Sequence, residues 1–127
     1  PPGPLVRAAL ESIALQTFDV VHAMEQDLRA NIERLCVDGG ASANDFLMQF
    51  QADMLGVPVE RPKTVETTAL GAAYLAGLSC GFYKDLASLG ELRGEGKTFS
   101  PKADGAVRAE KLSAWERALD RALLRGR

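Results

Sequence analysis

The first thirty residues place apolar side chains at alternating steps of three and four, the spacing of one face of an α-helix. The stripe comprises Val6, Leu10, Ile13, Thr17, Val20, Met24 and Leu28. Pro4 stands just before it, where proline is tolerated because the first N–H groups of a helix have no partner within it. The spacing therefore predicts a long helix from about residue 5 to about residue 29.

Two short apolar segments predict strands. Leu35-Cys36-Val37 is a continuous apolar run that ends at Gly39-Gly40, which is typical of a buried strand with helices on its faces. Residues 57–60 form a second extended segment. It contains Pro58, which cannot donate a backbone hydrogen bond, so we expect this strand at an edge or paired on one side only.

Three further helices are predicted, over residues 42–55, 66–78 and 107–124. Ser42 and Asp45 have the capping-box spacing, which favours a start at Ser42, while a start capped by Asn44 stays open. Gly56 is suited to end that helix because glycine adopts the left-handed conformation easily. The stretch between residues 79 and 105 is rich in glycine, and there we expect loops with at most one short helix near Leu86.

The order of these elements, helices alternating with strands, predicts an α/β layer structure. Only two strands are predicted, whereas a typical sheet has about five or six. Two strands are too few to cover three helices. We therefore expect a short, incomplete sheet, with the missing strands supplied by sequence outside this chain or by another copy.

Composition excludes several classes of function. The chain has 127 residues, of which 46% are apolar, enough for one domain with a core. A net charge of -2 argues against nucleic-acid binding, and no apolar run approaches the roughly 20 residues of a membrane helix. The start lacks the parts of a signal peptide. We expect a cytoplasmic protein without a metal site, since the single His22 has no second His or nearby Cys beside it.

The junction between the first strand and the second helix carries the candidate chemistry. The first N–H groups of a helix lack internal partners and carry a partial positive charge. Gly39 and Gly40 precede them without side chains that would hold a ligand away, an arrangement that favours a phosphate or another anion. Asn44 adds a side chain that both donates and accepts. A plain tight connection remains the alternative. The turn is neither a P-loop nor a dinucleotide fingerprint, because the Gly-Lys-Ser/Thr ending and the third glycine are missing.

Longer stretches around this turn resemble glycerol kinases, which belong to the FGGY family of carbohydrate kinases in the actin-like ATPase superfamily. The resemblance rests on Asp-Gly-Gly-Ala at 38–41 followed by Asn44, Phe-Leu-Met-Gln-Phe-Gln-Ala-Asp at 46–53, Val-Glu-Arg-Pro at 59–62, and Thr-Ala-Leu-Gly-Ala-Ala-Tyr-Leu-Ala-Gly at 68–77. It extends from about residue 5 to about residue 82.

The resemblance implies an α/β fold that is part of the C-terminal actin-like (ribonuclease H-like) ATPase domain. Residues 1–127 would form a partial domain, with a core at about 5–82 and a loop-rich tail and terminal helix at 83–127. It also implies a cofactor, ATP or ADP with Mg²⁺. In this family the turn contacts the nucleotide, here through the backbone of Gly40 and the side chain of Asn44, with Gly39 and Ala41 shaping the turn.

The resemblance further implies transfer of the terminal phosphate of ATP to glycerol, giving glycerol 3-phosphate. The catalytic base, the residues that hold glycerol and most groups that hold Mg²⁺ are expected in an N-terminal domain outside this chain. No catalytic or metal-binding residue is therefore expected here, and the chain alone is expected to be inactive. Another FGGY sugar kinase, such as a xylulokinase, and a non-catalytic interaction domain stay open, as does a homo-oligomer. Glu60 and Arg61 are interpreted as solvated loop charges.

Overall fold

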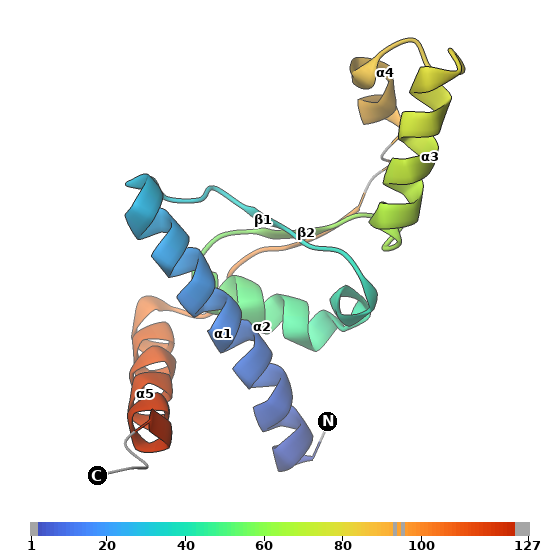
Figure 1. Ribbon diagram of the computed structural model, residues 1–127. Helices are drawn as coiled ribbons and strands as arrows, with labels where there is room; N and C mark the ends of the chain where they lie inside the picture. Colours follow the sequence, from blue (N-terminus) through green and yellow to red (C-terminus); the bar gives the residue numbers. More distant parts are fainter. Residues whose placement is uncertain (1–2, 93, 95, 124–127) are drawn as a thin grey trace.

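The computed structural model describes residues 3–92, 94 and 96–123, which form helices around a small sheet (Figure 1). In chain order the elements are α1 (Pro4–Leu28), β1 (Leu35–Cys36), a 3-10 turn (Gly40–Ala43), α2 (Asp45–Leu55), β2 (Val59–Arg61), α3 (Thr67–Ser79), α4 (Leu86–Glu91), β3 (Lys97–Phe99) and α5 (Gly105–Leu123). All four predicted long helices are confirmed, although the predicted end of the last one, Leu124, lies outside the described residues. None of the helices described combines the length and the apolar character needed to cross a membrane.

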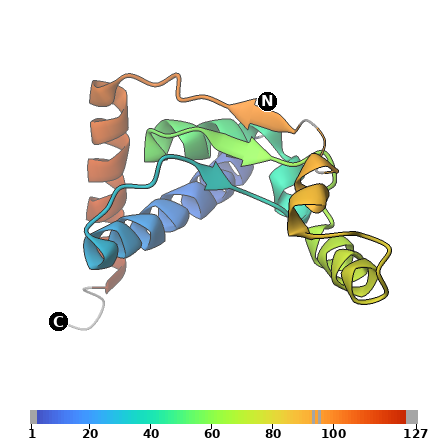
Figure 2. The ribbon, with the colours of Figure 1, turned by 90° about the horizontal axis from the view of Figure 1, so that it is seen from above.

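The sheet has three strands in the order β1-β2-β3. β1 and β2 run parallel, with Leu35 opposite Val59, and β2 and β3 run antiparallel, with Val59 opposite Phe99. Val59 and Phe99 face a core formed with α1 and α2, where Leu47 and Met54 are almost fully buried. Because side chains alternate in direction along a strand, the neighbouring pair Glu60 and Thr98 points to the other face of the sheet. The helices α1 and α2 lie together on one side of the strands (Figure 2).

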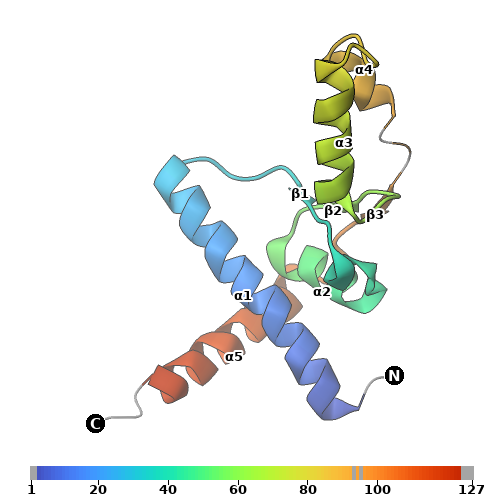
Figure 3. The same ribbon diagram turned by 45° about the vertical axis from the view of Figure 1, so that its right-hand side comes forward.

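Helices α3 and α4 stand beyond the end of the sheet, apart from this core (Figures 1 and 3). The loop between them packs on α3 where Gly77 leaves room for the ring of Tyr83, because a Cβ at Gly77 would lie 2.5 Å from that ring. At the opposite end of the molecule, α5 is joined to α1 by two polar contacts. Trp115 Nε1 donates to Asp19 at 2.7 Å, and Lys111 Nζ lies 3.3 Å from a Glu11 oxygen.

The apolar stripe that predicts α1 is not the buried face of that helix. Ala14, Leu15 and Val21 are buried, whereas most of the stripe is exposed, Val20 and Met24 among it. The helix has apolar residues on two sides, so their spacing locates the helix without showing which side the core covers.

The strand predictions are partly wrong. β1 is not buried, since Leu35 is half-buried and Cys36 exposed, because helices cover only one face of this sheet. β2 is the central strand and not an edge strand. Pro58 precedes it and needs only to accept, which it does from Leu35 N–H at 2.9 Å. β3 was expected to be loop, because its three residues, 97–99, are too few to show a periodic pattern.

Burial in the core predicts a large difference between two methionines. Met54→Ala should lower the free energy of unfolding by about 2–5 kcal/mol, because its side chain is 1% exposed and its loss leaves a cavity. Met24→Ala makes the same chemical change at a side chain that is 53% exposed, and should change stability by no more than about 0.5 kcal/mol. Urea unfolding of both variants checks this, and equal losses would show that the core is misplaced.

Candidate functional site

The predicted anion site lies where the chain passes from β1 into α2. Asn44 caps α2, because its Oδ1 accepts a hydrogen bond from Leu47 N–H at 3.1 Å. The start predicted at Ser42 is therefore wrong, and the start capped by Asn44 is confirmed. Ser42 instead belongs to the 3-10 turn, which is tighter than an α-helix and ends at Ala43, directly before the capping residue Asn44.

Gly39 gives the turn its shape. Its φ of 76° lies in the left-handed region, which favours glycine over residues with a Cβ. Its N–H donates to Val65 O at 2.9 Å, and its carbonyl accepts from both the N–H and the hydroxyl of buried Ser42. The N–H of Gly39 is therefore engaged, and this residue holds the turn rather than offering a donor.

Gly40 and Ala41 offer the donors. As the first two residues of the 3-10 turn, they have N–H groups without partners inside it. Within the described part of the chain, no hydrogen bond uses either group. Both residues are exposed, and a Cβ built on Gly40 would meet nothing within 4 Å. Packing inside this chain therefore does not require glycine at position 40, and the space beside the two N–H groups is open to a ligand.

Asn44 has one polar group left to contribute. Its Oδ1 is engaged by the cap, so only the side-chain NH₂ is available to donate to a ligand. The residue is exposed and follows the 3-10 turn directly. The structure thus brings all four predicted residues, Gly39, Gly40, Ala41 and Asn44, together at one turn. Gly39 shapes the turn, and the other three offer donors.

Two residues tie this turn to its surroundings. The hydroxyl of Thr67, the first residue of α3, donates to the Asp38 carboxylate just before the glycines. Arg61, at the end of β2, donates through Nη1 to Ser42 O at 2.6 Å and pairs with Asp45 at 2.9 Å. The interpretation of Arg61 as a solvated charge is wrong, because its side chain is only 16% exposed.

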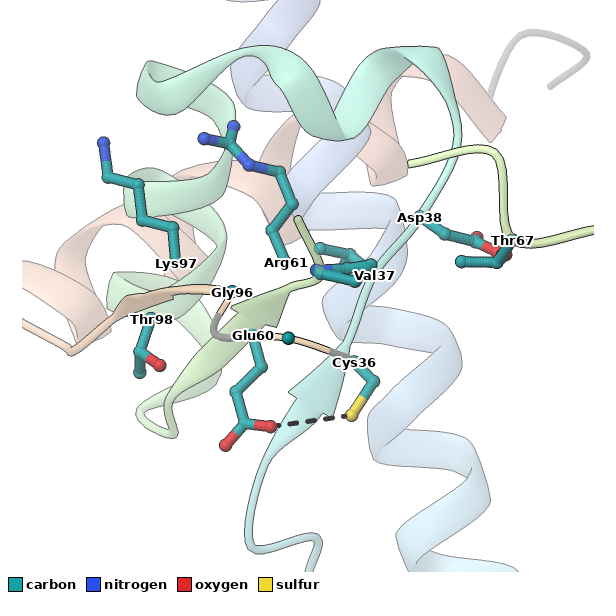
Figure 4. Close-up of a pocket in the computed structure, with 11 residues that line it drawn as sticks. Cys36, Val37, Asp38, Glu60, Arg61, Thr67, Gly96, Lys97 and Thr98 are labelled. Atoms are coloured by element: carbon teal, nitrogen blue, oxygen red, sulfur yellow. Dashed lines mark hydrogen bonds between the residues drawn. The ribbon is translucent and has the colours of Figure 1, made fainter. Parts of the chain in front are cut away.

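Glu60 fits the solvated interpretation better. Its carboxylate is 40% exposed and lies 3.6 Å from Arg34, on the opposite face of the sheet from Arg61 (Figure 4). The thiol of Cys36 donates to it at 3.9 Å. The side-chain partners described for Glu60, Arg34 and Cys36, are not residues of the glycine turn.

The first turn of α2 is anchored by charge. Asp45 accepts from Lys97 Nζ at 2.5 Å as well as from Arg61. The hydrogen bonds from Lys97 and then Arg61 lower the pKa of the Asp45 carboxyl below its ordinary value. Sequence reasoning missed both partners. Lys97 lies in the stretch expected to be loop. Arg61 and Lys97 follow Asp45 by 16 and 52 positions, and pairing over such separations leaves no local pattern.

Two pockets lie near the turn, and neither contains it. One of about 470 Å³ has walls from all three strands, Asp38 and Thr67 (Figure 4). The other, of about 380 Å³, lies between α3 and α4 and is lined mainly by apolar residues such as Leu70, Tyr74 and Leu89. The predicted residues from Gly39 to Asn44 line neither pocket and form an open shelf. Among the described residues, no group of three or more His, Cys, Asp or Glu could hold a metal ion.

Comparison with known proteins identifies the family. The description "FGGY family of carbohydrate kinases, C-terminal domain" matches residues 1–80. The chain is 54% identical to glycerol kinase 1 of Clostridium tetani over 118 residues, covering 93% of this chain and 24% of that protein. It is 56% identical to the glycerol kinase of Pasteurella multocida, covering 94% and 24%. The chain therefore belongs to the FGGY family of carbohydrate kinases, and it spans about a quarter of the length of these curated relatives.

Solved structures agree with this assignment. The crystal structure of Plasmodium falciparum glycerol kinase with ADP matches with a TM-score of 0.82 and 36% identity, over 94% of this chain and 24% of that one. A xylulose kinase from Lactobacillus acidophilus matches with a TM-score of 0.75 at 24% identity, over the same shares of the two chains, and shows the fold alone. The predicted fold, part of an actin-like α/β ATPase domain with an incomplete sheet, is confirmed.

The charges at the start of α2 predict a dependence of stability on pH. Because folding lowers the pKa of Asp45, its carboxylate stabilises the fold above its ordinary pKa of 3.8, and this contribution is lost as the pH falls through the lower, folded value. Asp45→Asn should therefore lose less stability than the unaltered chain between pH 6 and pH 3, measured by urea unfolding. Asp120→Asn removes the same charge from the exposed side of α5. An equal effect of both substitutions would contradict the prediction.

Proposed function

We propose that the chain is the C-terminal nucleotide-binding part of a glycerol kinase, an enzyme that transfers the terminal phosphate of ATP to glycerol to give glycerol 3-phosphate. The observation that carries the proposal is the pair of unpartnered N–H groups at Gly40 and Ala41, on an open shelf before α2. The identity of 54% and 56% with proteins named glycerol kinase supports the choice of substrate.

The chemistry of the turn suits the phosphates of ATP or ADP. Backbone N–H groups before a helix bind anions because they donate hydrogen bonds and carry the positive end of the helix dipole. Gly40 lets the phosphate approach these groups, and the NH₂ of Asn44 supplies a third donor beside them. A solved neighbour of 36% identity, the Plasmodium falciparum glycerol kinase, was crystallised with ADP.

The exposed turn from Gly39 to Asn44 would form one side of an active site. Phosphoryl transfer requires the acceptor, the metal and the terminal phosphate to be positioned together. We assign the catalytic base, the glycerol site and most of the Mg²⁺ ligands to the remainder of the parent enzyme, which works in the cytoplasm. Residues 1–127 then form a partial domain, with its core at 5–82 and its tail and terminal helix at 83–127. The exposed apolar residues of α1 and α3 are available for contacts with that remainder or with a second copy.

Kinases of other sugars share this fold, as the xylulose kinase match shows. Its 24% identity is lower than the 36% shared with the Plasmodium falciparum glycerol kinase, which favours glycerol over another sugar.

The proposal predicts weak binding of ADP by this chain, measured by calorimetric titration, without phosphorylation of glycerol when ATP and Mg²⁺ are added. Gly40→Val should weaken ADP binding by about tenfold or more, because its side chain fills the space before the N–H groups, where a Cβ meets nothing else within 4 Å. Asn44→Ser keeps a cap acceptor for Leu47 and removes the NH₂, so it should weaken binding with little loss of stability.

Gly71→Ala is the matched control. A Cβ at Gly71 also meets nothing within 4 Å, but it lies in α3, so binding should stay unchanged while the helix gains about 1 kcal/mol. ADP binding that survives Gly40→Val would refute a phosphate site at the turn. No binding at millimolar ADP would favour a non-catalytic interaction domain.

A further inference from the structure

Arg61 connects the sheet to the candidate nucleotide site. Its Nη1 donates to the carbonyl of Ser42 at 2.6 Å and pairs with the carboxylate of Asp45 at 2.9 Å. Ser42 belongs to the 3-10 turn that carries the free N–H groups, and Asp45 opens α2. One guanidinium therefore holds both sides of the turn's junction with the helix.

The carbonyl of Ser42 needs such a partner. The carbonyls of Gly39 and Ala41 accept from the amides of Ser42 and Asn44, whereas the donor described for the carbonyl of Ser42 is Arg61. Ser42 is buried, and a buried carbonyl without a donor is costly. Without Arg61, the turn would have to move so that this carbonyl could reach water.

The sheet holds Arg61 in place. It belongs to β2, the central strand of the sheet, and its guanidinium carbon lies 5.3 Å from the centre of the Phe99 ring on β3. Lys97 lies 4.9 Å from the same ring and also reaches Asp45. The two cations thus share a ring and a carboxylate. They differ in burial, since the side chain of Arg61 is 16% exposed and that of Lys97 52%. They also differ in that the contact described to the 3-10 turn comes from Arg61 alone.

We propose that Arg61 is a positioning residue for the nucleotide, which holds the turn so that the N–H groups of Gly40 and Ala41 face the phosphate together. This inference rests on the proposed function. Donors fixed before the ligand arrives bind more tightly, because less freedom is lost on binding. Arg61 has no contact with the ligand in this account and acts through Ser42 and Asp45.

The test compares Arg61→Met with Lys97→Met. Each removes one positive charge, one partner of Asp45 and one cation above Phe99, and each keeps an apolar stem. Arg61→Met should weaken ADP binding by about tenfold, in keeping with the loss of a charged hydrogen bond, while Lys97→Met should change it less than about twofold. Calorimetric titration of both variants and of the unaltered chain measures this.

Hydrogen exchange separates a local loss of order in the turn from a loss of overall stability. The amides of Ser42 and Asn44 bond inside the turn, to Gly39 and Ala41, so their protection reports on its order. In Arg61→Met their protection should fall by about tenfold, while that of the buried Met54 amide stays unchanged. In Lys97→Met all three should keep their protection.

Equal behaviour of the two variants, or an equal loss of protection at all three amides, would overturn the inference and leave the proposed function intact. Failure of the unaltered chain to bind ADP would instead refute the proposed function, and with it the role of Arg61 toward a nucleotide. The exchange comparison would then still decide whether Arg61 holds the turn.

Discussion

The burial of α2 is the constraint on which the rest of this structure depends. This helix contributes the largest share of the core, with Leu47 and Met54 almost fully buried between α1 and the sheet. A helix packed on both sides cannot rotate or slide without opening cavities. Its N-terminus is therefore fixed at the end of β1, and the glycine turn that leads into it is held at the same place.

The candidate site follows from this placement together with two requirements of the backbone. A helix start must leave some N–H groups without partners. Asn44 satisfies one such group at the start of α2, whereas at the start of the 3-10 turn no described hydrogen bond uses those of Gly40 and Ala41. The carbonyl of Ser42 must also be paired, which Arg61 does from the central strand. The result is an exposed turn with unpaired donors, which suits an anionic ligand.

The sequence predicted the helices better than it predicted the sheet. Helices leave a long periodic pattern. The residues of the glycine turn are neighbours in sequence, so their placement on one turn could be expected, while their role toward a nucleotide stays a prediction. Strands of two or three residues leave almost none, which is why β3 was missed and β2 was placed at an edge on the evidence of Pro58. The covered side of α1 depends on what packs against it, and the roles of Arg61 and Lys97 depend on contacts with Asp45 across the chain. Local spacing carries neither kind of information.

The most direct test of the central claim, that the glycine turn binds the phosphates of a nucleotide, is an NMR titration of the chain labelled with ¹⁵N with ADP. The account predicts that the largest shifts occur at the backbone amides of Gly40 and Ala41 and at the side-chain NH₂ of Asn44, and that inorganic phosphate moves the same two backbone signals. Shifts confined to the apolar pocket between α3 and α4, around Leu70 and Tyr74, would contradict it. So would the absence of any shift at millimolar ADP.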